Sequence, residues 1–187
     1  MVWIKWLGLA IVLLAVLAGG LNAYGAWRWA AGTRALMARL EATRVAPVPA
    51  RYDARELDGL PPAVQRYFRA VLKDGQPIIA AASVEHAGSF NMGETRDQWK
   101  PFTSRQRVVT RRPGFVWDGR VVMMPGLPVH VHDAYVAGEG ILRPALLGLF
   151  TLMDLRGTPE LAQGELMRFF AEASWYPTAL LPSQGVQ

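Results

Sequence analysis

The longest apolar run of the chain lies at its N-terminus. Residues Trp6 to Trp27 form a stretch of 22 residues without a charged side chain. As an α-helix rising about 1.5 Å per residue, it would reach roughly 33 Å, enough to cross a hydrocarbon core of about 30 Å. Trp3 and Trp6 stand at one end, and Tyr24, Trp27 and Trp29 at the other; such aromatic side chains favour the two membrane interfaces. The pattern predicts a retained transmembrane anchor over residues 1–27.

Two alternatives stay open for this segment. The first is a cleaved signal peptide, because Lys5 gives a basic start and Ala23-Tyr24-Gly25 is a weak cleavage signal. The second concerns orientation: three arginines after the span (28, 34 and 39) favour a cytoplasmic body by the positive-inside rule. A short basic tail before an apolar helix is instead typical of an uncleaved export signal, which slightly favours an extracytoplasmic body. We expect a single-pass protein of the cell (inner) membrane, with the side of the domain unresolved.

Residues 28–60 divide into a helix-forming part and a proline-containing part. The segment Arg28 to Arg44 is rich in Ala, Leu, Met and Arg, which favour a helix, and its arginines suit lipid phosphates. Pro47 and Pro49 end this basic juxtamembrane helix. Residues 45–60 are therefore predicted to be a linker, and residues 61–187 an α+β domain.

Hydrophobic periodicity predicts two helices and several strands in this domain. Residues 61–72 carry apolar side chains at helical spacing, so we expect this helix to cover a sheet. Thr158-Pro159-Glu160 is typical of a helix start and predicts a second helix near 159–172. Alternation predicts strands over 82–90, 105–111, 114–123 and 129–136, and short strands separated by turns favour an antiparallel sheet. The apolar run 145–153 is too short to span a bilayer and predicts a buried core segment.

Composition then excludes several function classes. The chain is 51% hydrophobic and 19% charged, has a formal net charge of +5 and contains no cysteine. It is too apolar for a disordered chain, and it lacks the thiols of a disulfide scaffold, a thiolate metal site or a cysteine nucleophile. No serine-hydrolase, phosphate-loop, dinucleotide or zinc-protease motif occurs. Basic residues gather beside the span rather than among stacking aromatics, so we expect no nucleic-acid partner.

One segment has the spacing of metal ligands. His130 and His132 would project from the same face of a strand, and His86 on another strand would be the third ligand. The alternative interpretation is a solvent-facing pair of histidines beside core valines. A metal site here would support a metal-dependent enzyme.

Two further sets of side chains are candidates for function. Asp118 and Asp133 on neighbouring strands could form a carboxylate pair tuned for acid–base chemistry, or cross-strand ion pairs that only fix the register. The aromatic residues could line a lipid-binding groove or fill the core. The candidate ligand-binding residues are Trp99, Phe115, Trp117, Tyr135 and Trp175.

Four segments resemble a known family. They are PPAVQRYFRAVL (61–72), PGFVWDGR (113–120), DAYVAGEG (133–140) and GELMRFFAEASWYPTALLP (164–182). They are similar to motifs of an uncharacterised bacterial family of single-span membrane proteins with a conserved domain of unknown function. The resemblance covers residues 60–182 and implies a membrane-anchored α+β domain, with no catalytic residue to carry over. Members of that family continue past this segment with further strands, so it also implies a C-terminally truncated member.

The expected sheet with helices on its concave face is more loosely similar to the half-barrels of periplasmic lipoprotein carriers, a similarity of fold alone. The leading hypothesis is a membrane-anchored, non-enzymatic module that needs no cofactor. It would contact the bilayer through residues 6–27 and bind an apolar ligand, a lipid or a protein partner of unknown identity at the membrane surface. The alternative hypothesis is the metal-dependent enzyme that uses the His-x-His pair.

Overall fold

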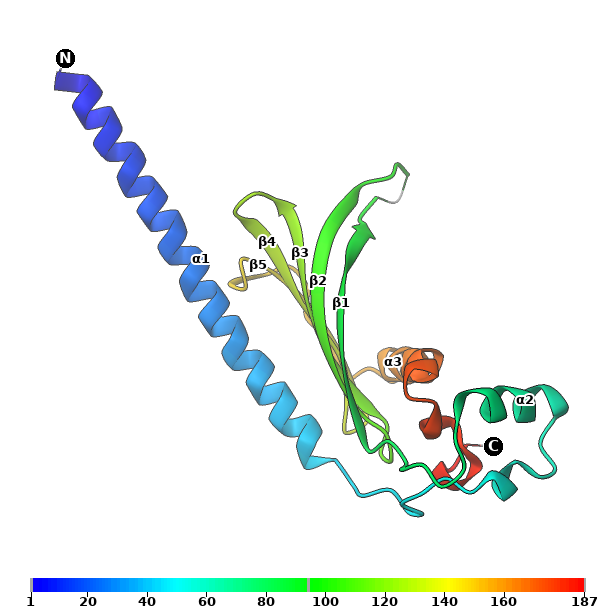
Figure 1. The fold of residues 1–187 in the computed structure, drawn as a ribbon. Helices are drawn as coiled ribbons and strands as arrows, with labels where there is room; N and C mark the ends of the chain where they lie inside the picture. Colours follow the sequence, from blue (N-terminus) through cyan, green and yellow to red (C-terminus); the bar gives the residue numbers. More distant parts are fainter. Residues whose placement is uncertain (1, 94, 187) are drawn as a thin grey trace.

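The computed structural model describes residues 2–93 and 95–186. It contains a long N-terminal helix, an open antiparallel sheet and shorter helices around one end of the sheet (Figure 1). The α+β class expected from the sequence is confirmed.

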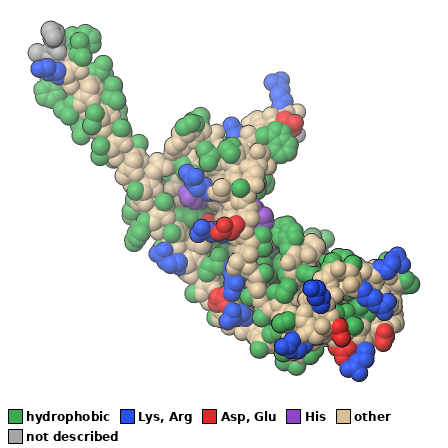
Figure 2. Space-filling view, in the orientation of Figure 1, with side chains coloured by type: hydrophobic (Ala, Val, Ile, Leu, Met, Phe, Trp, Pro, Cys, Tyr) green, Lys and Arg blue, Asp and Glu red, His purple; other side chains and the backbone are tan. Residues whose placement is uncertain are grey.

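Helix α1 (Val2–Ala42) is continuous through the predicted anchor and the predicted juxtamembrane helix. All residues from Trp3 to Leu21 are exposed, and α1 is the one helix in the described part of the chain that is long and apolar enough to cross a membrane. Figure 2 shows hydrophobic side chains around the N-terminal part of α1, whereas most of the charged side chains visible in that view lie over the domain. Beyond Ala26, buried Trp29 and Leu40 turn one side of the helix toward the sheet. The helix therefore has an apolar half (Trp3–Ala26) and a docked half.

The sheet is an antiparallel meander in the order β1-β2-β3-β4-β5-β6, with β7 also paired to β5. The four predicted strands are confirmed, and a fifth long strand follows them. The bounds are β1 (Ala81–Asn91), β2 (Trp99–Val109), β3 (Gly114–Met124), β4 (Leu127–Val136), β5 (Glu139–Leu146), β6 (Phe150–Thr151) and β7 (Leu155–Arg156).

The prediction of a buried core segment over 145–153 holds for Ala145 and Gly148, which are buried, but is wrong for residues 150–153, which are exposed. Leu147 and Gly148 adopt positive φ values of 56° and 70°, which end β5 in a tight turn. Phe150 and Leu152 beyond this turn are 57% and 60% exposed. An apolar run alone does not show that the chain reverses direction at the surface.

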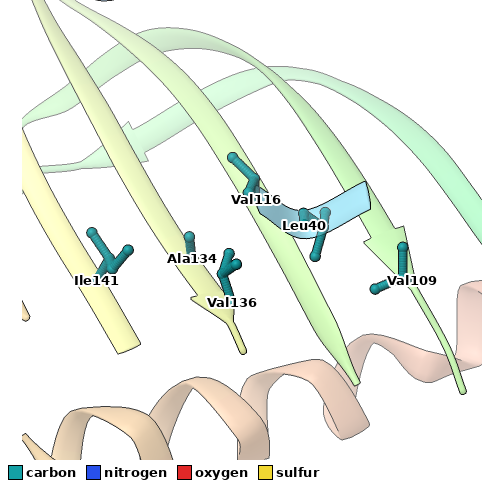
Figure 3. Close-up of a cluster of buried hydrophobic side chains, with 6 residues drawn as sticks. All are labelled: Leu40, Val109, Val116, Ala134, Val136 and Ile141. Carbon is teal, nitrogen blue, oxygen red and sulfur yellow. The ribbon is translucent and has the colours of Figure 1, made fainter. Parts of the chain in front are cut away.

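The docked half of α1 and helix α3 (Pro159–Glu172) lie on opposite faces of the sheet. Under the end of α1, Leu40 packs into a cluster of strand residues (Figure 3): Val109, Val116, Ala134, Val136 and Ile141. Under α3 and the helix that follows it, a second cluster contains Val108, Phe115, Phe169, Ala173, Tyr176 and Ala179. These are the α1 face and the α3 face of the sheet.

Helix α2 (Pro62–Val71) does not cover the sheet as the sequence predicted. Its buried residue Phe68 packs in a separate cluster with Tyr52, Leu57, Leu72, Ile78 and Leu181. The cluster also includes η1 (Ala54–Leu57) and lies next to the C-terminal helices η2 (Ala173–Trp175), η3 (Pro177–Leu180) and η4 (Pro182–Gln184). Because Tyr52 and Leu57 are core residues, the segment predicted to be a linker packs into the domain from residue 52 onward.

Candidate functional site

The docked half of α1 is held to the sheet by a group of polar side chains. Trp29 and Thr33 lie one helical turn apart and therefore on one side of α1. The Trp29 indole Nε1 donates to Asp118 Oδ1 at 2.8 Å, and the Thr33 hydroxyl donates to Asp118 Oδ2 at 3.0 Å. Both carboxylate oxygens of a β3 residue are thus bound by α1.

His132 on β4 completes this group, which we call the α1 joint (Trp29, Thr33, Asp118 and His132). Its Nε2 lies 2.8 Å from the Thr33 oxygen. When the single Thr33 proton goes to Asp118, or to the Trp29 carbonyl oxygen at 3.2 Å, His132 is the donor and is the Nε2–H tautomer. The ring also stacks on Trp29 with centroids 3.8 Å apart and an angle of 16° between the planes.

The histidines of the α1 face are neutral at pH 7. Burial lowers the pKa of His132 to about 4, even though Asp118 favours its charged form. Burial also lowers the pKa of His130. His130 borders an open groove of about 600 Å³ between α1 and strands β1–β4, with charged residues Glu85, Arg105, Asp118 and Arg120 in its lining.

The structure does not bring the three histidines together. His86 lies on the α3 face, where its Nδ1 is 3.0 Å from Ser104 Oγ and its ring is 5.2 Å from the ring of Trp175. Among the residues that the structure describes, no group of three or more His, Asp or Glu side chains is placed to hold a metal ion. The predicted ligands His130 and His132 belong instead to the surroundings of α1.

The candidate carboxylate pair is separated as well. The register aligns Asp118 with His132 and Trp117 with Asp133, and neighbouring positions of a strand point to opposite faces. Asp118 therefore faces α1, and Asp133 faces α3. The hypothesis that these two carboxylates act together is wrong.

Asp133 belongs to a polar layer between α3 and the sheet. The Arg168 guanidinium donates to Asp133 Oδ2 and, at 2.8 Å, to Glu172 Oε1. The Gln106 amide of β2 donates to Glu172 Oε2. The guanidinium carbon also lies 4.9 Å from the ring centroid of Phe115 and 5.6 Å from that of Trp117, within cation–π range.

Glu165, one turn before Arg168, is only 8% exposed. Burial, reinforced by nearby Asp133, raises its pKa to about 8, and burial raises the pKa of Asp133. At pH 7 Glu165 is therefore protonated. This layer is not among the sites predicted from the sequence, although a glutamate on the otherwise apolar side of the helix was its signal.

Beyond the polar layer, the α3 face continues as an apolar surface toward the far ends of the strands. In the described part of the chain, α3 crosses only the lower end of this face, and the upper parts of β1 and β2 bend toward its side (Figure 1). We call this surface the open face. Its strand residues are Phe90, Phe102, Trp117, Val121, Val129, Val131, Leu142, Pro144 and Leu146. Phe90 is exposed, Val121 and Val129 are buried, and the other six are half-buried.

Aromatic rings lie across the open face in a row. The rings of Phe90 and Phe102 are 6.2 Å apart, and those of Phe102 and Trp117 are 6.3 Å apart. The Trp117 ring covers Gly119, where an added Cβ would lie 2.0 Å from the indole. This glycine lets the indole lie flat on the sheet. Phe90 at the end of the row is 49% exposed.

The five predicted ligand-binding residues are distributed over different places. Trp117 is half-buried on the open face, and Trp175, which is 52% exposed, lies beside His86 on the same side. Phe115 is completely buried under α3, with Tyr135 beside it. Trp99 is 60% exposed but occupies an α1-face position at the end of β2. Only Trp117 and Trp175 are placed where a ligand on the open face would touch them.

Comparison with known proteins identifies the family without indicating an activity. No curated protein and no solved structure matches the chain. A family model described as a family of unknown function (DUF6920) matches residues 58–187, which include α2, the whole sheet and α3. The domain of unknown function expected from the sequence motifs is thereby confirmed, and the chain belongs to DUF6920.

Proposed function

We propose that this protein is a single-pass membrane protein whose domain holds the acyl chain of a lipid on the open face. The observation that carries the proposal is the row of aromatic and aliphatic side chains that continues from the polar layer of α3 to the ends of the strands. Apolar surfaces that remain uncovered on a folded domain typically bind a ligand, a membrane or another protein. An extended acyl chain can lie along such a surface without needing polar partners.

The anchor supports a lipid rather than a soluble ligand. The apolar half of α1 has the length of a bilayer core and carries aromatic residues at both ends. The α1 joint fixes the sheet to this helix, so the open face stays close to the bilayer. From the short basic tail before the apolar run, we place the domain on the extracytoplasmic side of the cell membrane.

Photo-crosslinking of the full chain tests this function. The protein is reconstituted in phosphatidylcholine vesicles that contain a lipid with a diazirine in its acyl chain, and the crosslinked peptides are mapped by mass spectrometry. We expect crosslinks on β1–β3 peptides that contain Phe102 or Trp117, in addition to those on α1. The crosslinks on α1 report lipid contact and serve as the internal reference.

Two variants of β2 provide a matched comparison. Phe102→Asp places a charge on the open face, whereas Thr103→Asp places the same charge on an exposed position of the α1 face. Because an unpaired charge is poorly tolerated in an apolar contact, we expect about a tenfold loss of sheet crosslinks in the first variant and little change in the second. Equal crosslinking of the two variants, or crosslinks confined to α1, would contradict lipid binding on the open face. A co-purifying protein that blocks the crosslinks would instead identify a protein as the occupant.

A further inference from the structure

The two ends of the sheet lie beside different parts of α1. In the meander, the β1–β2, β3–β4 and β5–β6 turns share one end, and the β2–β3 and β4–β5 turns share the other. Gly25 of α1 packs so closely on the β5–β6 turn that an added Cβ would lie 1.9 Å from Leu147 O. At the opposite end, Leu40 packs on Gly114 and Val109. The first end therefore points toward the apolar half of α1 (Figure 1).

The turns at these two ends differ in chemistry. The residues around the β3–β4 turn (123–128), and those from the β5–β6 turn through β6 (147–153), include no charged residue. The opposite end has Arg111 and Arg112 in the β2–β3 turn and Glu139 at the start of β5, whereas the β1–β2 turn is the charged one at the first end, with Glu94, Arg96 and Asp97 in its sequence. The end toward the apolar half of α1 carries large exposed apolar side chains from all three of its turns: Phe90, Met92, Trp99, Met124, Phe150, Leu152 and Met153.

The position of Gly25 relates these turns to the bilayer. From Trp3 to Tyr24 the helix rises roughly 32 Å at about 1.5 Å per residue, which matches a hydrocarbon core of about 30 Å. The boundary of that core then falls near Tyr24, one residue before the contact between Gly25 and the β5–β6 turn. This turn lies at the depth of the lipid interface when α1 spans the bilayer.

We propose that the β1–β2, β3–β4 and β5–β6 turns insert into the interface of the same bilayer that α1 spans. The domain then stands on the membrane, and the open face begins at the lipid surface. Tryptophan and other amphipathic aromatics favour the interface, and Arg96 and Lys100 near the β1–β2 turn suit lipid phosphates. The only acid described there, Asp97, accepts a hydrogen bond from the Asn91 amide at 3.0 Å. The inference rests on the membrane-spanning role proposed for α1, and not on ligand binding by the open face.

The absence of cysteine from the chain allows a direct test of depth. Single cysteines labelled with the fluorophore NBD are placed at Met124 and Leu152 in two of the turns, at Arg112 in the opposite end and at Leu13 in α1. Each labelled full chain is reconstituted in vesicles of three parts phosphatidylcholine to one part phosphatidylglycerol, with or without nitroxide-labelled acyl chains. All four positions are exposed, so the labels leave the core intact.

The expected result is strong quenching of NBD by the lipid nitroxide at positions 13, 124 and 152, and at least threefold weaker quenching at position 112. If NBD is strongly quenched at position 13 but is quenched at positions 124 and 152 only as weakly as at position 112, the inference is overturned, while α1 still lies in the membrane. NBD fluorescence that is blue-shifted but unquenched at positions 124 and 152 would mean that protein, such as a second copy of the chain, covers the turns. This outcome also overturns the inference. Absence of quenching at all four positions would remove the membrane-spanning role of α1 as well.

Discussion

The two faces of the sheet are closed by helices in contrasting ways. On the α1 face, neutral donors from Trp29 and Thr33 satisfy the Asp118 carboxylate, and a neutral histidine completes the joint. On the α3 face, the guanidinium of Arg168 donates to one oxygen of each of two carboxylates, and a protonated glutamate lies beside them. The first arrangement fixes a helix that continues into the apolar half. The second closes only the lower end of its face and leaves an apolar surface above it.

This difference separates tethering from binding. The α1 face sets the position of the domain relative to the anchor, because a single helix forms both. Helix α3 covers only one end of the α3 face (Figure 1), which is the face on which the proposed lipid would lie. Acid is expected to destabilise the α1 face through His132, and alkali the α3 face through Glu165. A change of pH can therefore weaken one face without the other.

The largest effect is expected where α1 meets the β5–β6 turn. Gly25→Leu would force its side chain into Leu147 O, whereas at Gly20 an added Cβ meets no described atom within 4 Å. Such overpacking against backbone should lower the free energy of unfolding by about 3 kcal/mol. Thermal unfolding of the detergent-solubilised protein measures this loss of stability, with Gly20→Leu as the matched control. Similar melting temperatures for the two variants would contradict the docking of α1 on the sheet.

The α1 joint is tested next by removing its acceptor. Asp118→Ala leaves the Trp29 indole and the Thr33 hydroxyl without their charged partner, which should cost about 2 kcal/mol of unfolding free energy. Glu85→Ala on the same face removes an exposed ion pair with Arg105, which is expected to cost less than about 0.5 kcal/mol. Denaturant titrations of both variants provide the comparison. An equal cost would show that the joint is no stronger than a surface ion pair.

Acidification should weaken the α1 face specifically. The pKa of His132 is about 4 in the folded protein against an ordinary value of 6.5, so the unfolded chain takes up the proton first. Stability is then full above pH 6.5 and falls as the pH drops toward 4, by about 1–2 kcal/mol between pH 7 and 5. His132→Asn should flatten this dependence in unfolding curves recorded across that range. A variant as acid-sensitive as the parent would exclude His132 as the cause.

Alkalinisation should weaken the α3 face by a smaller amount. The pKa of Glu165 is raised from an ordinary 4.5 to about 8, so its contribution is complete below pH 4.5 and is lost as the pH rises through 8. We expect about 1 kcal/mol less stability at pH 8 than at pH 7. Glu165→Gln should remove that loss, whereas Glu160→Gln on the exposed first turn should retain it. The opposite outcome for the two variants would contradict a buried, protonated Glu165.

The local elements of the fold could be predicted from the sequence because they depend on short periodicities. Alternation correctly predicted a strand over 114–123, and Thr158-Pro159 correctly marked the start of α3. The partner of each apolar stripe could not be predicted. The stripe of α2 is the same whether it packs on a sheet or, as observed, on Tyr52 and Leu57.

The candidate site could not be predicted, because it depends on hydrogen bonds between residues that are far apart in the sequence. Thr33 and Asp118 are 85 positions apart, and Asp133 and Arg168 are 35 apart; no local spacing connects them. Strand parity could place His130 and His132 on one face, but it could not show that α1 would cover that face. Trp117 was predicted to meet a ligand and does lie on the open face. Phe115, two positions before it on the same face, is covered by α3.

The central claim is that α1 is one helix that leaves the bilayer and docks on the sheet. Spin labels at successive single cysteines along α1, in the vesicle-reconstituted protein, measure it most directly through their collisions with oxygen and with a water-soluble nickel complex. We expect frequent collisions with oxygen and few with nickel for labels from about residue 6 to residue 24. From Trp29 to Leu40 we expect protection from both reagents every three to four residues. Nickel access throughout residues 6–24, or no periodic protection after them, would contradict the claim.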